Sequence, residues 1–313
     1  MKKNLLITGG SGFLGINLAN KLKKKYNVFL GSRNNKRNFE AKTITGCEIY
    51  PLDVVSKSSI KDAFNYIKPE IVIHAAATKF VDLSEKFPFE CTDVNILGST
   101  NIARACIDYK VKIAIGVSTD KASQPIKNLY GMSKAVMEKI FLAANDQGKT
   151  NFICVRYGNV AWSTGSVLPI WKQMFEKNKI IFTTGPYMRR FFFTVDEAVE
   201  LILVSLKRAK LYSGKIVSTE MKSAKMIDIL KVWIANFGGK YKIVNLRKGD
   251  RIDEYLIGYN ELKFTSKEII NGKKYFIIDF KQDNKKSLKK IVSSENSKKL
   301  SKYEILRILR LNI

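Results

Sequence analysis

A glycine-rich segment near the N-terminus constrains the fold of this chain more than any other feature. It has the spacing Gly9-x-x-Gly12-x-x-Gly15, follows a short apolar run, and opens a helix-like segment that reaches about Lys25. Glycines at this spacing let the backbone approach a pyrophosphate closely, and the N-terminus of the following helix favours its negative charge. The segment therefore predicts a dinucleotide-binding β–α unit. Its expected cofactor contacts are Gly9, Ser11, Gly12, Phe13, Leu14 and Gly15.

Apolar runs alternate with helix-like segments along the first half of the chain. This alternation is typical of a parallel sheet with helices on both faces, whose ligands bind beyond the carboxyl ends of the strands. We therefore predict an α/β fold, with a Rossmann-type doubly wound parallel sheet and a smaller C-terminal substrate-binding lobe. Strands are expected at residues 3–8, 26–31, 47–52, 70–74, 111–118 and 152–156, and helices at about 58–67, 92–109 and 130–147.

The pattern becomes irregular beyond residue 158, where prolines and glycines interrupt it. This change predicts a division of the chain into connected parts. Residues 1–158 form the dinucleotide-binding Rossmann domain, joined by a returning helix at about 194–209. Residues 159–279 form an interleaved substrate-binding lobe, and residues 280–313 form a basic C-terminal tail with a helix.

Composition excludes several classes of protein. No apolar run approaches the roughly 20 residues that span a bilayer, and the apolar run at the N-terminus is too short for a signal peptide. We therefore expect a cytoplasmic protein with no transmembrane segment. Four cysteines lie far apart without a Cys-x-x-Cys pair, and His74 is the one histidine, so no metal site is expected.

The chain carries a formal net charge of +27, mostly from lysines spread along its length. Scattered lysine is typical of a solvated surface, so no nucleic acid partner is expected. Attraction of an anionic nucleotide, or loose contact with a membrane surface, fits this charge better.

The second predicted strand ends in a basic segment with no carboxylate after Leu30. A carboxylate there would bind a ribose 2′-hydroxyl, whereas basic side chains favour a 2′-phosphate. The sequence therefore favours NADP, with NAD as the alternative. The residues expected at this end of the cofactor are Ser32, Arg33, Asn34, Lys36 and Arg37, with Asp53 and Val54 beside the adenine.

Tyr130 and Lys134 are separated by one helical turn and so lie on one face of a helix. A phenol is a poor base at neutral pH, but a nearby ammonium and an oxidised nicotinamide would stabilise the phenolate. Tyr130 can then take a proton from an alcohol while a hydride leaves the same carbon.

The segment Ser118-Thr119-Asp120-Lys121 predicts a second chemical task. The carbon beside a ketone is acidic, and a neutral amine of Lys121 could remove its proton if neighbouring cations lower the lysine pKa. A protonated Asp120 could donate a proton to a departing hydroxyl. This pair indicates dehydration; the alternative is a solvated ion pair in a loop. Thr119 completes the expected catalytic set.

Other residues near strand ends are expected to contact ligands. Ala75, Ala76, Ala77, Asn95, Val117 and Ser118 are expected at the cofactor, while His74 has a structural role at its strand end. Arg190 and Arg247 could bind a pyrophosphate. The expected substrate contacts are Lys79, Asn159, Val160, Ser163, Thr164, Arg190, Arg247 and Asp250.

The order of these segments resembles the extended short-chain dehydrogenase/reductase superfamily. Within it the chain is similar to the inverting UDP-N-acetylglucosamine 4,6-dehydratases of surface-polysaccharide and pseudaminic-acid biosynthesis. The most specific shared element is Asp120-Lys121, whereas retaining dehydratases typically carry Asp-Glu there and 4-epimerases lack both. The loop 123–129 is one residue longer than in the family, with Lys127 as the extra residue.

The resemblance implies that Tyr130 assists oxidation at C4, Lys121 takes the C5 proton, and Asp120 helps water to leave from C6. Return of the hydride to C6 and reprotonation from the opposite face would give a UDP-2-acetamido-2,6-dideoxy-hexos-4-ulose inverted at C5. It also implies UDP-N-acetylglucosamine or a related nucleotide sugar as substrate, and a homo-oligomer. A 4-epimerase and a non-catalytic NADP-binding regulator are the alternative functions.

Overall fold

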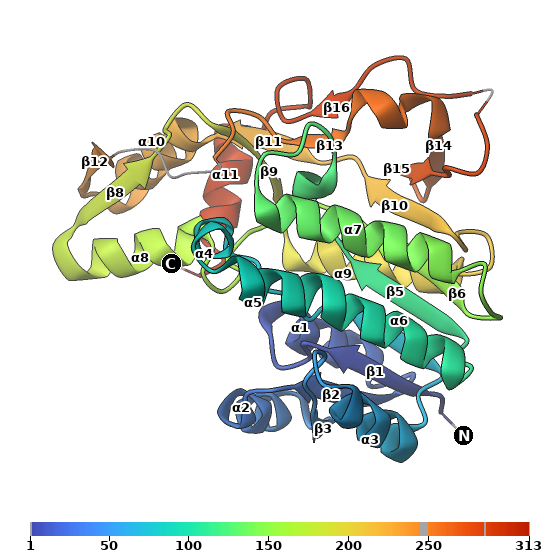
Figure 1. The fold of residues 1–313 in the computed structure, drawn as a ribbon. Helices are drawn as coiled ribbons and strands as arrows, with labels where there is room; N and C mark the ends of the chain where they lie inside the picture. Colours follow the sequence, from blue (N-terminus) through green and yellow to red (C-terminus); the bar gives the residue numbers. More distant parts are fainter. Residues whose placement is uncertain (1, 245–249, 285, 313) are drawn as a thin grey trace.

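The computed structural model describes residues 2–244, 250–284 and 286–312 and has a nine-stranded sheet at its centre (Figure 1). Seven strands run parallel, and the two at one edge form an antiparallel hairpin. From that edge, the strands are β14 (Thr265–Ile270), β15 (Lys273–Ile278), β10 (Lys215–Thr219), β6 (Asn151–Val155), β5 (Ile113–Val117), β4 (Ile71–His74), β1 (Asn4–Thr8), β2 (Asn27–Ser32) and β3 (Glu48–Pro51).

Helices cover both faces of this sheet, which explains why its central strands consist of almost continuous buried apolar residues. On one face α3 (Lys57–Ile67), α6 (Gly98–Asp108) and α7 (Leu129–Ala144) lie side by side. On the other face α1 (Phe13–Leu22) packs against α9 (Val195–Lys207) and α2 (Asn35–Thr45) (Figure 1). The predicted fold class, a Rossmann-type doubly wound sheet, is confirmed.

The sheet extends further along the sequence than the expected boundary at residue 158. Strands β10, β14 and β15 come from the segment 159–279, yet they continue the large sheet beyond β6. The signal that revealed the first strands is weak here, because β14 exposes polar residues such as Lys267 and pairs on one side only. The large sheet therefore includes part of the segment that was assigned to the substrate-binding lobe.

A second hydrophobic core holds the smaller lobe together and contains all three tryptophans, Trp162, Trp171 and Trp233. Its helices are α8 (Val167–Asn178), α10 (Met226–Phe237) and α11 (Lys302–Leu309). Three small sheets accompany them: β7 (Asn159–Val160) with β9 (Arg189–Phe193) and β11 (Lys222–Lys225); β8 (Ile180–Thr184) with β12 (Lys240–Val244); and β13 (Tyr255–Ile257) with β16 (Val292–Ser293).

Short helical segments connect these elements near the carboxyl ends of the parallel strands. They are α4 (Val81–Lys86), α5 (Pro88–Thr92), the π-helical turn η1 (Asp93–Leu97), and the 3-10 helices η2 (Asp120–Ala122) and η3 (Tyr259–Phe264). Among the described residues, no helix combines the length and the apolar character needed to cross a membrane.

Candidate active site

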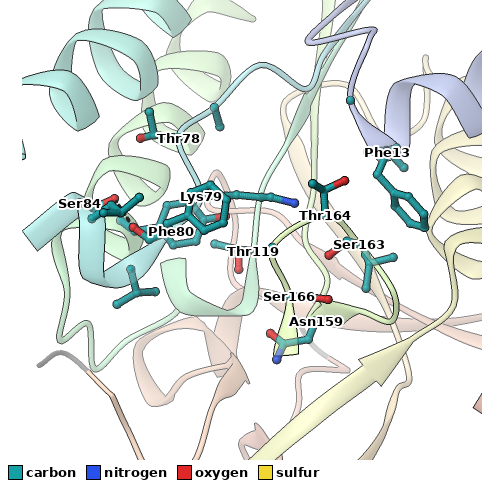
Figure 2. A pocket seen from close by; sticks show the side chains of 18 of the residues that line it. Phe13, Thr78, Lys79, Phe80, Ser84, Thr119, Asn159, Ser163, Thr164 and Ser166 are labelled. Atoms are coloured by element: carbon teal, nitrogen blue, oxygen red, sulfur yellow. Dashed lines mark hydrogen bonds between the residues drawn. The ribbon is translucent and has the colours of Figure 1, made fainter. Parts of the chain in front are cut away.

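A cavity of about 990 Å³ lies beyond the carboxyl ends of β1, β4 and β5 and is bounded by both parts of the molecule. Figure 2 shows Lys79 pointing into it from one side and Ser163, Thr164 and Asn159 from the other. The predicted residues that line it are Gly9, Ser11, Gly12, Phe13, Leu14, Gly15, Ser32, Arg33, Asn34, Arg37, Asp53, Val54, Ala75, Ala76, Ala77, Lys79, Val117, Ser118, Thr119, Lys121, Tyr130, Lys134, Asn159, Val160, Ser163, Thr164, Arg190 and Asp250.

Four of the predicted residues are not among those that line the cavity. Lys36 lies near the start of α2 and does not line the cavity, because the helix presents Asn34 and Arg37 to it instead. Asn95 is buried behind the wall, where it bonds both backbone groups of Thr78. Asp120 is also fully buried, directly behind Lys121. Arg247 lies outside the described residues.

The glycine segment forms a cradle in which side chains on Gly9 and Gly15 would clash with neighbouring backbone. Gly9 has a φ of +68°, and a Cβ built on it would lie 2.8 Å from the Cα of Ala76. A Cβ on Gly15 would lie 2.3 Å from the carbonyl oxygen of Gly10. Gly9, Gly12 and Gly15 therefore form a tightly packed turn that also lines the cavity, and the residues present fit a dinucleotide.

The basic residues after β2 meet a carboxylate that the sequence analysis did not include. Arg33 pairs with Glu90 of α5 at 3.0 Å, with both side chains about half exposed. Burial, together with the positive charge of Arg37, lowers the pKa of Lys79, which also lines the cavity. Asp53 accepts a hydrogen bond from the backbone of Val55, so it shapes its turn as well as lining the cavity.

His74 has structural contacts. Its ring nitrogens contact the hydroxyls of Thr8 at 2.7 Å and Ser99 at 3.0 Å, and the ring is fully buried. Burial, with a contribution from the charge of Lys134, lowers its pKa to about 3. The ring is therefore neutral at physiological pH and joins β1, β4 and α6.

Lys121 is at the centre of the site, and its ammonium contacts three oxygen acceptors. Its Nζ lies 3.1 Å from Oδ1 of Asp120, 3.2 Å from Oδ1 of Asn159 and 3.3 Å from Oε1 of Glu254. The short helix η2 places Asp120 and Lys121, while β7 supplies Asn159. Glu254 precedes β13 and had no signal in the sequence, because an acid distant in the chain reaches the site only through the fold.

The charges around Lys121 correct one expectation. Burial acts to lower the pKa of Lys121, but the carboxylates of Asp120 and Glu254 outweigh it and raise that pKa above its usual value. The expectation that neighbouring cations lower the pKa of Lys121 is therefore wrong: Arg190 acts in that direction, but its effect is smaller than that of the carboxylates. For Asp120, burial raises the carboxyl pKa despite the nearby ammonium. A hydrogen bond of 3.1 Å joins this acid to the amine, so the protonation of each group depends on the other.

Tyr130 lies in the first turn of α7, which begins after Asn128 caps it by accepting from the Gly131 amide at 2.8 Å. Burial raises the pKa of Tyr130 to about 12, while the charge of Lys121 and a hydrogen bond with Thr119 oppose this rise. Lys121 is thus a cation that acts on the phenol. Burial lowers the pKa of Lys134 itself to about 8.

The longer loop does not separate Tyr130 from the Asp120-Lys121 pair. A Cβ built on Gly131 would lie 2.3 Å from the carbonyl oxygen of Lys121, so α7 and η2 are in direct contact. Leu129 donates its amide to Glu85 at 2.7 Å, and the guanidinium of Arg251 donates to the carbonyl of Pro125. These contacts fix both sides of the extra residue, Lys127.

A buried arginine at the end of β6 connects the two ends of the catalytic segment 118–123. Arg156 pairs with Glu138 of α7 at 2.7 Å and with Glu261 of η3 at 2.9 Å. Glu138 accepts from the Ser118 hydroxyl at 2.5 Å, and Glu261 accepts from the Ser123 hydroxyl at 2.8 Å. One guanidinium therefore orders both anchors of the segment that carries Asp120 and Lys121.

The doubly wound fold, the glycine cradle, and a tyrosine beside an acid–lysine pair together define an enzyme of the extended short-chain dehydrogenase/reductase type. The family described as polysaccharide biosynthesis protein matches residues 5–277. Because this match covers most of the sequence, the chain belongs to that family.

Individual relatives agree with this assignment. The inverting UDP-N-acetylglucosamine 4,6-dehydratase of Campylobacter jejuni is 34% identical over 274 residues, which cover 84% of this chain and 80% of that protein. A Rickettsia typhi protein named UDP-glucose 4-epimerase is 31% identical, covering 98% of this chain and 95% of its own. The X-ray structure of Pen from Bacillus thuringiensis superimposes with a TM-score of 0.89 at 29% identity, covering 99% and 97% of the two chains. The resemblance to inverting dehydratases is confirmed.

Proposed function

We propose that this protein dehydrates UDP-N-acetylglucosamine to a UDP-2-acetamido-2,6-dideoxy-hexos-4-ulose with inversion at C5. The observation that carries the proposal is the contact between Lys121 and the fully buried Asp120, at 3.1 Å, beside Tyr130. An enzyme that only oxidises and reduces C4 needs no acid–amine pair beyond the tyrosine. Elimination of water needs both a base at C5 and an acid at the leaving hydroxyl.

The proton needed for elimination is already within the pair. Transfer of a proton from Lys121 Nζ to Oδ1 of Asp120 along their hydrogen bond gives a neutral amine and a carboxylic acid. Burial by itself favours this neutral pair, because it raises the pKa of the carboxyl group and acts against the ammonium, whereas the charges of Asp120 and Glu254 favour the ammonium. Lys121 then takes the C5 proton, and Asp120 protonates the hydroxyl leaving C6 as water.

Tyr130 takes the C4 hydroxyl proton, assisted by Thr119 and by the charge of Lys121. A nicotinamide bound in the cavity supplies reversible hydride acceptance, from C4 and back to C6. Phe13, Leu14 and the glycine cradle would hold the dinucleotide, while Arg190 and Asp250, which lie 3.8 Å apart, line the part of the cavity proposed for the nucleotide sugar.

NADP is the proposed cofactor, with NAD as the alternative. Arg37 and Lys79 both line the cavity, and these two cationic side chains support the binding of an anionic 2′-phosphate there. Glu90 beside Arg33 would instead fit a free 2′-hydroxyl. The proposed product serves surface-glycan synthesis, and the protein is proposed to form a homo-oligomer.

The 4-epimerase alternative is favoured by one observation, the epimerase name of a relative that matches 98% of this chain. Incubation of the purified protein with UDP-N-acetylglucosamine in heavy water, followed by NMR, distinguishes the two. A 4-keto-6-deoxy product with deuterium at C5 supports the dehydratase. A product of unchanged mass with an inverted C4 hydroxyl would establish the epimerase instead, and cofactor binding without any product would indicate the regulator.

A Lys121→Ala variant tests the role of the amine. We expect it to bind the cofactor normally and to lose elimination by a factor of about 10² to 10⁴, the usual range for a positioned acid or base. Lys127→Ala, which removes an exposed lysine from the adjacent loop, is the matched control. Full elimination activity in Lys121→Ala would remove Lys121 from the proposed role.

A further inference from the structure

Glu254 is a buried carboxylate between Lys121 and Arg190. Its Oε1 lies 3.3 Å from Nζ of Lys121 and 3.6 Å from Nε of Arg190, and only 3% of the side chain is exposed. The same oxygen therefore faces both the proposed base and the cation proposed to bind the substrate. Burial at this depth strengthens each of these interactions relative to water.

The second oxygen of Glu254 fixes the position of the first. Arg251 donates to Oε2 through Nε at 3.0 Å and also through Nη2. The backbone amide of Glu254 donates to the Ser294 hydroxyl at 3.0 Å. Arg251 further donates to the carbonyl of Pro125, in the loop that leads to Tyr130. Glu254 is thus held rigidly against Lys121 from two directions.

We propose that Glu254 is a positioning residue that holds Lys121 as an ammonium before catalysis and sets the pH at which the Asp120–Lys121 pair loses its proton. This inference rests on the proposed function. The ionised state of Glu254 is secured by Lys121, Arg190 and Arg251, which outweigh its burial and lower its pKa.

The titratable groups that face Lys121 come from its own short helix and from three other places in the fold. Asp120 on η2 and Glu254 before β13 are carboxylates, Arg190 on β9 is cationic, and Tyr130 on α7 carries a phenol. Of the two carboxylates, Asp120 is needed as the acid of the reaction, so its charge changes during the cycle. Glu254 is the carboxylate whose charge stays constant, and it therefore determines the baseline charge on Lys121.

Glu254→Gln removes this constant charge while nearly preserving the shape of the side chain. An opposite charge within about 4 Å typically shifts a pKa by 1–3 units, so the pKa of Lys121 should fall. We expect the limb of the pH–rate profile that reports loss of the Lys121 proton to move to lower pH by about one unit or more. The measured rate is deuterium incorporation at C5 of the sugar, followed by NMR across the pH range.

Asp253→Asn is the matched control, because it makes the same change on the neighbouring carboxylate, which pairs with Arg189 rather than Lys121. We expect its profile to coincide with that of the wild type. A Glu254→Gln profile that also coincides with the wild type would overturn the inference while leaving the dehydratase proposal intact. Absence of C5 exchange in the wild type would instead refute the proposed function.

Cofactor titration shows whether each variant is folded. If Glu254→Gln does not bind the dinucleotide, Glu254→Asp decides the question. Shortening the side chain by one methylene moves the charge away from Nζ, so its profile must shift in the same direction by a smaller amount. An unshifted profile for a folded Glu254→Asp variant would overturn the inference.

Discussion

The positions of individual basic residues determine how this cavity would distinguish one dinucleotide from another. Lys36 and Arg37 are neighbours in the sequence, and composition gives no reason to separate them. The helix α2 does separate them, since the Asn34 side chain caps the amide of Arg37 at 2.9 Å and Arg37 lines the cavity while Lys36 does not. Adjacent cations therefore differ in whether they line the cavity.

This separation gives a prediction for Arg37→Gln. Loss of a guanidinium beside the 2′-phosphate should weaken NADP binding about tenfold or more, because a charge-assisted bond contributes roughly 1.5–3 kcal/mol, and should leave NAD binding nearly unchanged. Fluorescence titration with both dinucleotides measures the two dissociation constants. Lys36→Gln removes the same charge one residue away and should change neither; an equal loss of NADP and NAD affinity in Arg37→Gln would contradict 2′-phosphate recognition.

Residue types and spacing predicted which side chains come together better than they predicted the charge states of those side chains. Asp120 and Lys121 are adjacent in the sequence, so their proximity could be inferred directly. The pKa of Lys121 depends on Glu254, which is more than 130 positions away and reaches the site only when β13 joins β16. Spacing along a chain carries no information about such a partner, and the expected effect of cations on Lys121 was wrong for this reason.

At the scale of elements, the first β–α unit was predictable because the residues that define it are consecutive in the sequence. The glycines, the strand before them and α1 follow one another without interruption. The antiparallel strands β14 and β15 were not predictable in this way, since their position depends on pairing with β10 across the chain. Local sequence therefore determined the cofactor cradle but not the far edge of the sheet.

The catalytic segment itself is ordered by elements from three parts of the chain. Arg156 after β6 orders Glu138 on α7 and Glu261 on η3, and these carboxylates hold Ser118 and Ser123. Removing one member of a buried ion network leaves uncompensated charge, which is more damaging than loss of the attraction alone.

Arg156→Gln should therefore lower the free energy of unfolding by about 3–5 kcal/mol, measured by urea denaturation. Arg208→Gln provides a matched control, because Arg208 pairs with Glu268 at 3.2 Å but both side chains are at least one-third exposed. The control should lose about 0–1 kcal/mol. Equal, small losses in both variants would show that the Arg156 network does not order the segment.

At the scale of the whole molecule, the C-terminal helix α11 closes the smaller lobe. Ile305 and Leu309 are buried in the second core beside α10, and Trp162 donates its indole N–H to the carbonyl of Ile308 at 2.7 Å. The sequence predicted a helix near the C-terminus, but its basic surroundings gave no sign that it packs across the lobe that shapes the substrate side of the cavity.

Because α11 completes this core, substitutions on its apolar face should destabilise the protein as much as substitutions at the centre of the large sheet. Leu309→Ala should lower the free energy of unfolding by about 2–5 kcal/mol, since it leaves a cavity among well-packed side chains. All three tryptophans lie in the same core, so their fluorescence reports its unfolding directly. Tyr303→Ala changes a residue of the same helix that is 76% exposed and should have an effect within about 0.5 kcal/mol.

Two probes applied to Leu309→Ala show how the lobe and the sheet unfold. If tryptophan fluorescence and far-UV circular dichroism give the same midpoint, the lobe and the sheet unfold as one cooperative unit. A midpoint unchanged from that of the wild type would mean that α11 does not stabilise the lobe.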